Sequence, residues 1–401
     1  MRIWIDAEPT FASPKLFGMT LLDRILRSLD KLPNKPIDVV VSCSSEMAEG
    51  QGYPVIRENG SVGERLARYL DNNDSTVLVV DGGAVVDHRL FPLLMQDTDS
   101  ACLKGGGGLK ETALLRLGPG VAVPSHALSV AEIAKASVEA GETREMDASD
   151  LPGFVVNLRR DVPFVLERIA DENDRASLER RMFLLNYKGS TDFMTKWVYP
   201  PLVWQCVKVC VRWDIHPNVV TIASILLAIA AVPLFAYGHW VAGFLAAYGM
   251  SVLDSVDGKV ARVTLTDSPV GNVLDHGLDI VHPPFWYAAW AAGLGASSTG
   301  GPLYSALLWL VFFYIADRLV LMVAKKRFKR GLHAVTALDG SARTFIARRN
   351  VNLVIMTLGV IVGLGEQAFY FITIWQGLTF SWHTMRTVWL FPRSRFERYL
   401  V

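Results

Sequence analysis

Four aspartates lie close together in the second half of the chain. Asp254 and Asp257 are three residues apart, whereas Asp275 and Asp279 are four apart. Either spacing places a pair on one face of a helix. Two such helices joined by a short loop can bring all four carboxylates together, and hard divalent cations prefer carboxylate oxygens. The spacing therefore predicts a site for Mg²⁺ or Mn²⁺ between two consecutive helices.

Small and basic residues stand between the two aspartate pairs. Gly258, Ala261 and Gly271 leave room at the same surface for a bulky substrate. Arg262 can pair with a diphosphate group. Apolar runs flank the segment, and an ionised Asp at the middle of a bilayer costs about 2.5–3.5 kcal/mol on insertion scales. Bound cations would offset that cost. The competing interpretation is a charged loop that only caps two helices, and the spacing disfavours it.

The composition divides the 401-residue chain into two halves that must position this segment. Hydrophobic residues make up 51% of the whole, yet residues 1–190 mix charged and apolar residues as a globular domain does. From Asn218 onward long apolar runs alternate with short breaks, and a membrane-spanning helix needs about 20 mostly apolar residues. The ranges expected to span a membrane are 218–237, 239–256, 270–294, 302–324, 350–366 and 368–391. The last range is the weakest, because it contains His383 and Arg386.

Lysine and arginine residues indicate how these spans are oriented. Lys259 and Arg262 follow the second range, and the break after the fourth range is strongly basic, whereas the breaks on the opposite side contain neither residue type. Both termini and the aspartates are therefore predicted to face the cytosol. The net charge of +1 gives no sign of a nucleic-acid partner.

Residues 188–217 are expected to connect the two halves. Aromatic residues alternate there with Lys196, Lys208 and Arg212, which predicts a helix lying in the membrane interface. Pro200 and Pro201 would kink this helix or delay its start. A plain linker is the alternative.

The first half, residues 1–187, is predicted to be a cytosolic α/β domain. Residues 1–6, 37–42 and 77–81 are expected to form strands, and residues 21–32 and 62–70 have helical spacing. The glycine run at residues 105–108 lacks a following Lys-Ser/Thr, so we interpret it as a surface loop rather than a phosphate loop. The predicted fold class is multidomain: this α/β domain, then a six-helix transmembrane domain at 218–401.

The aspartate segment matches every fixed position of the pattern D-x₂-D-G-x₂-A-R-x₈-G-x₃-D-x₃-D. In this pattern the chain resembles the CDP-alcohol phosphotransferase family, over roughly residues 188–391. The resemblance implies that two divalent cations, Mg²⁺ or Mn²⁺, are bound by Asp254, Asp257, Asp275 and Asp279. It also implies that Asp279 is the general base that deprotonates the acceptor hydroxyl. The hydroxyl oxygen would then attack the β-phosphorus of a CDP-alcohol, and CMP would leave.

The same resemblance assigns further residues and partners. It implies that the CMP part is surrounded by Asp254, Gly258, Ala261, Arg262 and Gly271. Arg318 and Lys325 are candidates for binding the acceptor, although Asp317 and Arg318 can also be interpreted as a local ion pair. A homodimer in a bacterial inner membrane is expected, with a CDP-alcohol donor and an alcohol acceptor as substrates, and a lipid can serve as either of them.

The first half resembles sugar-phosphate nucleotidyltransferases. Residues 12–29 are similar to the Pro-Lys stretch and following helix of that family, and residues 77–82 to its strand ending in a metal-binding Asp, here Asp81. The Gly-rich nucleotide loop that should precede Pro14 and Lys15 is missing. Backbone amides of such a loop cradle phosphate, so the domain is predicted to be degenerate and non-catalytic.

Three functions remain open at this point. The two halves together resemble fused inositol-phosphate cytidylyltransferase/di-inositol-phosphate-phosphate synthases, which make their own CDP-alcohol. The alternative that we favour is a membrane phosphotransferase of phospholipid or polar-headgroup lipid synthesis with an inactive soluble domain. A non-catalytic membrane scaffold is the third, and the intact aspartates disfavour it.

Overall fold

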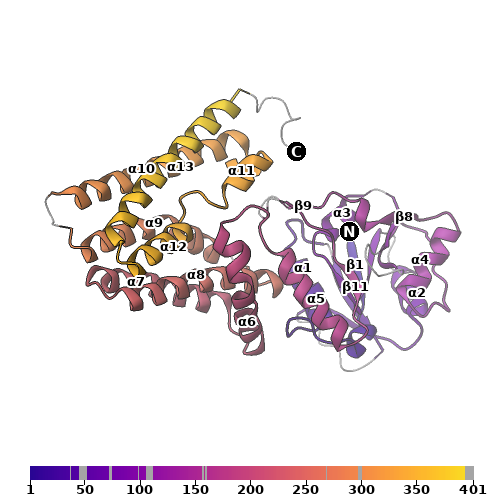
Figure 1. Cartoon of the computed structure of the whole chain (residues 1–401). Helices are drawn as coiled ribbons and strands as arrows, with labels where there is room; N and C mark the ends of the chain where they lie inside the picture. Colours follow the sequence, from indigo (N-terminus) through magenta and orange to yellow (C-terminus); the bar gives the residue numbers. More distant parts are fainter. Residues whose placement is uncertain are drawn as a thin grey trace. The chain divides into compact units, whose positions relative to one another are not determined.

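The computed structural model describes residues 1–392 except 37, 45–51, 72–74, 98, 105–111, 156–157, 159, 268 and 297–299. The side chains of residues 269–276, 278 and 279 also lie outside the described part. The chain forms two compact units, the first comprising Met1–Val155 and Asp161–Leu185, the second Val156–Arg160 and Asn186–Val401 (Figure 1). The domain boundaries predicted from the sequence stay predictions.

The first unit is an α/β domain, as predicted. Its described strands are β1 (Arg2–Asp6), β2 (Asp38–Cys43), β3 (Val55–Arg57), β4 (Val77–Asp81), β5 (Ala84–Val86), β6 (Ala101–Lys104), β7 (Thr112–Leu117), β8 (Arg144–Asp147), β9 (Phe154–Val155) and β11 (Leu166–Arg168). A further short strand, β10, covers Arg160–Asp161. Its described helices are α1 (Leu21–Asp30), α2 (Val62–Asp71), α3 (Leu90–Gln96), α4 (Val130–Glu139) and α5 (Glu172–Leu185), with short 3₁₀ turns at Glu8–Ala12 and Ala148–Asp150.

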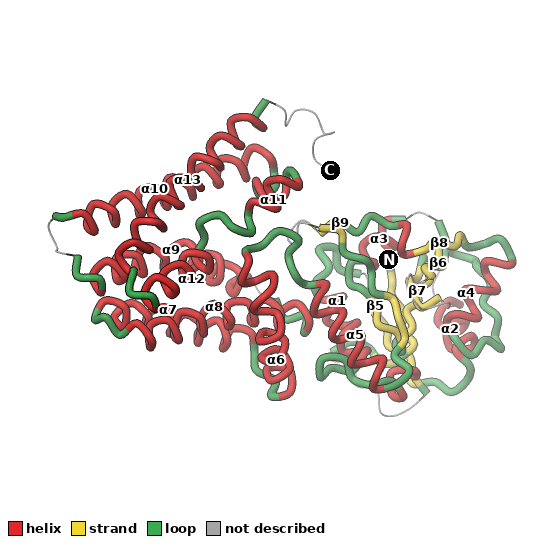
Figure 2. The backbone as a smooth tube through the Cα atoms, in the orientation of Figure 1, coloured by secondary structure: helices red, strands yellow, loops and turns green. Residues whose placement is uncertain are grey.

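The main sheet of this unit has the strand order β3-β2-β1-β4-β7-β6-β8 within the described residues. β1 pairs in parallel with both β2 and β4, whereas β7 runs antiparallel to its neighbours. Successive side chains of a strand point to opposite faces. Ile3 and Ile5 of β1 pack on one side against α1, and Trp4 packs on the other side against α2 and α4. The uninterrupted apolar runs Ile3–Ile5 of β1 and Val77–Val80 of β4 thus match a sheet that is covered on both faces (Figure 2).

The second unit is helical in its described part. Its long helices are α7 (Pro217–Ala236), α8 (Trp240–Val263), α9 (Pro269–Gly293), α10 (Pro302–Phe328), α12 (Arg349–Ile361) and α13 (Gly365–Leu390). Further elements precede and connect them: a turn of π-helix at Met194–Val198, α6 (Tyr199–Arg212), a 3₁₀ turn at Leu332–Ala334 and α11 (Ala337–Ala342). α7 lies alongside α8, and α10 lies alongside α13 (Figure 2). Each range predicted to span a membrane coincides with one of the six long helices.

The predicted number of membrane spans is not confirmed. Among the described residues, two helices are long and apolar enough to cross a membrane, α7 and α10, and α12 is apolar but shorter. α8 carries four charged residues between Asp254 and Arg262, which lowers its apolar character. α6 begins at Tyr199 with Pro200 and Pro201 in its first turn and directly continues the π-helical turn at Met194–Val198, so the prolines do not delay the helical segment.

The core of the helical unit is aromatic at the turn between α7 and α8. The Phe235 ring is fully buried and contacts the rings of Trp240, Phe244, Trp286 and Trp290. Where α9 passes this turn, a Cβ atom added to Gly293 would lie 2.1 Å from the carbonyl oxygen of Phe235. The absence of a side chain there lets the two backbones touch, which fixes α9 beside α7.

Candidate active site

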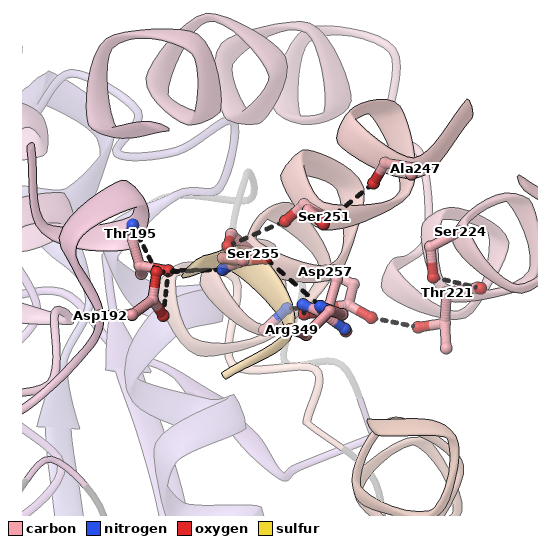
Figure 3. A network of polar contacts seen from close by, with 12 residues as sticks. Asp192, Thr195, Thr221, Ser224, Ala247, Ser251, Ser255, Asp257 and Arg349 are labelled. Carbon is pink, nitrogen blue, oxygen red and sulfur yellow. Dashed lines mark hydrogen bonds and ion pairs between the residues drawn. The ribbon is translucent and has the colours of Figure 1, made fainter. Parts of the chain in front are cut away.

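The buried carboxylate of Asp257 is the centre of the described site. This residue on α8 is 4% exposed, and its Oδ2 accepts a hydrogen bond of 2.7 Å from the Thr221 hydroxyl on α7. Its Oδ1 accepts from the backbone N–H of Gly258 at 2.5 Å. Figure 3 shows this contact between Thr221 and Asp257. The Thr221 hydroxyl also lies 3.2 Å from the carbonyl oxygen of Pro217. The packing of α7 on α8 therefore fixes the orientation of the carboxylate.

One turn earlier on α8, Asp254 forms an ion pair with Arg349, the first residue of α12. The Arg349 Nη2 atom donates to Asp254 Oδ2 at 2.8 Å, and the two side chains are only 13% and 17% exposed. A guanidinium so close to a largely buried carboxylate offsets much of its desolvation. The pair also ties α12 to α8, although 95 residues separate the partners in the chain.

The network continues from α12 to the segment before α6 (Figure 3). Asn350, next to Arg349, donates through Nδ2 to Asp192 Oδ1 at 3.1 Å. Asp192 Oδ1 also accepts from the backbone N–H of Thr195 at 3.1 Å, and Oδ2 accepts from the Thr195 hydroxyl at 3.0 Å. Burial alone would raise the pKa of Asp192, but the Arg348 charge and the hydrogen bonds from Asn350 and Thr195 hold it below its ordinary value. The connecting segment is thus part of the support of the site.

The residues predicted to surround a nucleotide lie on the same helix end. A Cβ atom added to Gly258 would lie 3.3 Å from Arg262 Nη1, so the guanidinium lies against the glycine backbone. Ala261 is partly exposed beside it. Gly271 lies in α9, outside the residues whose side chains are described. With Asp254, four of the five positions predicted to surround the nucleotide therefore lie on α8.

The structure describes half of the predicted metal-binding carboxylates. Asp275 and Asp279 belong to α9, and their side chains lie outside the described part. Within the described residues, no group of three or more His, Cys, Asp or Glu could hold a metal ion. Asp254 and Asp257 themselves fit a hard cation, because they present carboxylate oxygens one helical turn apart. Whether all four carboxylates meet stays a prediction.

The two candidate acceptor-binding residues lie on α10. Arg318 pairs with the adjacent Asp317 at 3.0 Å, so the predicted local ion pair is present, and Lys325 is exposed near the end of the helix. Asp317 is fully buried and has a second partner that the sequence did not reveal: its Oδ1 lies 2.5 Å from Nδ1 of His383 on α13. This contact and the Arg386–Asp339 ion pair at 2.7 Å explain how α13 accommodates its charged residues.

Several residues of the site belong to no pattern that would identify them as site residues from the sequence. Thr221, Arg349 and Asn350 are ordinary residue types at helix termini or within apolar runs, and their partners lie far away in the chain. In the sequence, the basic residues of the break before α12 indicate only how the predicted membrane spans are oriented. Its last member, Arg349, contacts Asp254 directly.

In the α/β unit, two arginines neutralise carboxylates at the ends of the parallel strands. Asp6 ends β1 and pairs with Arg65 at 2.8 Å, and Arg65 also donates to the Ser42 hydroxyl at 3.0 Å. Burial raises the pKa of Asp6, although Arg65 opposes this shift. Asp81, the predicted metal ligand at the end of β4, forms an ion pair with Arg168. Ligands of open α/β sheets bind at this edge of the strands, so the arginine pairs agree with the predicted degenerate domain.

Together, the helices and carboxylates define a class: a helical domain with membrane-length apolar helices and paired aspartates at one helix end. Residues 214–383 match the CDP-alcohol phosphatidyltransferase family. The matched range includes all four aspartates of the sequence pattern.

Individual relatives match shorter parts of the chain. Human ethanolaminephosphotransferase 1 is 30% identical over 142 residues, covering 31% of this chain and 36% of its own. Archaetidylinositol phosphate synthase from Aeropyrum pernix is 42% identical over 72 residues, covering 18% of this chain and 37% of its own. The chain thus spans a little over a third of the length of these relatives. A crystal structure of phosphatidylinositol phosphate synthase from Mycobacterium tuberculosis with CDP-DAG bound covers 48% of this chain and 96% of its own, with a TM-score of 0.37 and 17% identity.

Proposed function

We propose that this protein is a membrane enzyme that transfers a substituted phosphate group from a CDP-alcohol to an alcohol acceptor and releases CMP. The observation that carries the proposal is the pair Asp254 and Asp257, held on α8 inside the domain that matches the family. The relatives named above are an ethanolaminephosphotransferase and an archaetidylinositol phosphate synthase, which favours a product of phospholipid or polar-headgroup lipid synthesis.

In this proposal the aspartates of α8 and α9 have two roles, metal binding and proton transfer. Asp254 and Asp257, with Asp275 and Asp279, would hold Mg²⁺ or Mn²⁺, as two cations. Bound there, the cations would supply positive charge that stabilises the diphosphate and the departing CMP. Asp279 would accept the proton of the acceptor hydroxyl, whose oxygen forms a bond to the β-phosphorus while the bond to CMP breaks.

The remaining residues of the pattern would bind and orient the donor. Gly258, Ala261 and Gly271 would let the CMP part approach the helix backbone, and Arg262 would pair with phosphate oxygens. Arg318 and Lys325 remain candidates for the acceptor. The described contacts of Asp257 with Thr221 and Gly258 keep its carboxylate oriented without a substrate, which favours a preorganised site.

The membrane arrangement is part of the same proposal. Large apolar side chains are exposed along the outer faces of α7 and α10, for example at Leu226, Ile229 and Phe312, and lipid contact would cover them. Six spans with both termini and the site in the cytosol fit the distribution of Lys and Arg. Leu202 and Val209 on α6 and Trp213 at its C-terminal cap are exposed, which suits a helix lying in the interface. A multi-pass protein of a bacterial inner membrane, acting as a homodimer, agrees with this arrangement.

The experiment is metal-dependent release of CMP by the purified full chain in detergent. CDP-diacylglycerol, CDP-inositol and CDP-glycerol would be offered with Mg²⁺ or Mn²⁺ and a panel of alcohols. We expect one donor to be used, and Asp279→Asn to abolish release while the protein stays folded. Asp214→Asn, an exposed change outside the site, is the matched control. Full CMP release by Asp279→Asn would exclude Asp279 as the base, and no release from any donor by the wild type would count against the proposal.

A second candidate is a bifunctional enzyme that also makes its own CDP-alcohol. The Asp6–Arg65 and Asp81–Arg168 pairs disfavour it, since they engage the carboxylates where a cation would bind. Incubation with CTP and a polyol phosphate decides between the two: pyrophosphate release would establish the second activity.

A further inference from the structure

A buried histidine–aspartate pair joins α13 to α10, the helix that carries the candidate acceptor residue Arg318. These two helices lie alongside each other (Figure 1). His383 is 1% exposed and Asp317 is 0% exposed, and Nδ1 of His383 lies 2.5 Å from Asp317 Oδ1. Because an ionised carboxylate only accepts hydrogen bonds, Nδ1 carries the proton of this contact. The other oxygen of Asp317 accepts from Arg318 Nη2 at 3.0 Å. Asp317 therefore connects His383 to Arg318.

Further contacts fix the orientation of His383. Its ring packs edge-on against the ring of His333, with the ring centroids 4.9 Å apart. Nδ1 of His333 lies 3.2 Å from the carbonyl oxygen of Asp339. The Asp339 carboxylate accepts from Nε and Nη2 of Arg386 at 2.7 and 2.9 Å, and Arg386 follows His383 by three residues on α13. These contacts hold α13 so that His383 faces Asp317 in one orientation.

The Arg318 guanidinium also lies over an aromatic ring that contacts α9. Its Cζ atom is 5.1 Å from the ring centroid of Tyr314, which stands four residues earlier on α10. The Tyr314 hydroxyl donates to the backbone carbonyl of Ile280 at 2.9 Å. Ile280 follows Asp279, the proposed base, in the chain. Tyr314 therefore links Arg318 to the part of the α9 backbone that carries the base.

A guanidinium held in this way is suited to binding a substrate. Arginine has five N–H donors, and the described ion pair with Asp317 uses the Nη2 group, so donors remain for a ligand. A side chain that is already fixed in its binding conformation loses less entropy when the ligand binds. Asp317 can fix Arg318 only while its own carboxylate stays in place, and His383 forms the second hydrogen bond that keeps it there.

We propose that His383 is a positioning residue of the proposed reaction: through Asp317 it holds the Arg318 guanidinium in the orientation that binds the acceptor alcohol. The inference rests on the proposed function, because that function brings an acceptor to the base on α9. His383 and Asp317 are buried and do not touch the acceptor themselves. Their loss should therefore weaken acceptor binding and leave donor binding unchanged.

The experiment measures KM and kcat for each substrate with the purified full chain in detergent, together with the melting temperature of each variant. Glycerol, inositol and their monophosphates are offered as acceptors with the three CDP-alcohols named above, and the pair from which the wild type releases CMP fastest is used throughout. His383→Leu removes the donor to Asp317. His383→Asn keeps an N–H group near the position of Nδ1, whereas His383→Gln places its amide farther from the backbone.

The expected result is a change in one kinetic constant. KM for the acceptor should rise about tenfold in His383→Leu and in His383→Gln, while kcat and KM for the donor stay at the wild-type values. His383→Asn should restore most of the acceptor affinity. In an Arg318→Gln background, His383→Leu should cause no further rise, since both changes remove the same interaction. Gln376→Met is the matched control, because Gln376 is also 0% exposed on α13 but has no contact with Asp317 among the described residues.

The outcomes separate a positioning role from a structural one. A rise in acceptor KM that His383→Asn reverses supports the inference, and if His383→Leu does not fold, the comparison of His383→Asn with His383→Gln decides. An unchanged acceptor KM in the folded variants would overturn the inference and leave the proposed function standing. Equal rises in both KM values, or a further rise in the double variant, would also overturn it, because His383 would then act on the fold as a whole. A wild-type protein that releases no CMP with any pair would remove the proposed function and this inference together.

Discussion

Removal of the Arg349 guanidinium tests how strongly α12 is coupled to the carboxylates of α8. Arg349→Gln would leave Asp254, which is 17% exposed, without its 2.8 Å partner. Breaking a buried ion pair by removing one partner costs about 3–5 kcal/mol. Because both side chains keep some exposure to solvent, we expect the lower end, about 3 kcal/mol of unfolding free energy. The measurement is equilibrium unfolding in mixed micelles with EDTA present.

The structure also predicts how this loss can be reversed. In Asp254→Asn/Arg349→Gln no charge is left unpaired, so the double variant should recover about 2 kcal/mol relative to Arg349→Gln. Mn²⁺ should stabilise Arg349→Gln more than the wild type, since a bound cation would replace the missing positive charge at Asp254. Arg212→Gln, at the exposed end of α6, should stay within about 0.5 kcal/mol of the wild type. If Arg349→Gln also stayed within that range in EDTA, the ion pair would contribute nothing to the stability of the site.

Three further predictions concern single contacts. Thr221→Val removes the 2.7 Å hydrogen bond to Asp257 and should lower the unfolding free energy by about 1–3 kcal/mol, measured in the same micelles, whereas Thr221→Ser should keep most of it. Gly293→Ala places a Cβ atom 2.1 Å from the Phe235 carbonyl, so it should lower the melting temperature and the yield of folded protein in detergent. The pKa of Asp192 is lowered in the folded protein, so its ionised carboxylate stabilises the fold fully above the ordinary pKa of 3.8, and this stabilisation is lost as the pH falls through the folded pKa. In Asp192→Asn, the melting temperature should therefore fall less steeply below about pH 4 than in the wild type.

Each of these has an outcome that would contradict it. Equal stability of the valine and serine variants would mean that the Thr221 hydroxyl contributes nothing. A fully stable Gly293→Ala protein would show that α9 can move away from Phe235. Identical acid profiles for Asp192→Asn and the wild type would place the stabilisation on other groups.

The sequence located the helices because their apolar runs are long, but it misplaced some of their ends. The second range was expected to end at residue 256, where the charges begin, yet α8 continues to Val263. The helix continues because its charged residues have partners: Thr221 for Asp257 and the Asn186 carbonyl for Lys259. Periodicity records which residues are apolar and does not record such partners.

The candidate site likewise contains residues that the sequence pattern predicts and residues that only the folded structure reveals. The pattern from Asp254 to Arg262 was readable because its members are neighbours on one helix. Arg349 and His383 were not, since their partners Asp254 and Asp317 lie 95 and 66 residues away and only packing brings them together. Ion pairs across that distance depend on helix order and register, which the composition of each segment does not determine.

The contacts of the segment before α6 bear on where the chain can be cut. The hydroxyl of Ser190 donates to the Gly340 carbonyl at 3.3 Å, and the N–H of Phe193 donates to the Thr344 carbonyl at 3.0 Å. Together with the Asp192–Asn350 contact, they anchor a stretch that precedes the family match by more than twenty residues to the loop before α12. A fragment trimmed to residues 214–383 would retain every aspartate of the pattern and still lack the backbone that holds α12 in register. A fragment that keeps these contacts therefore has to begin at or before Ser190, in a stretch that lies outside the family match.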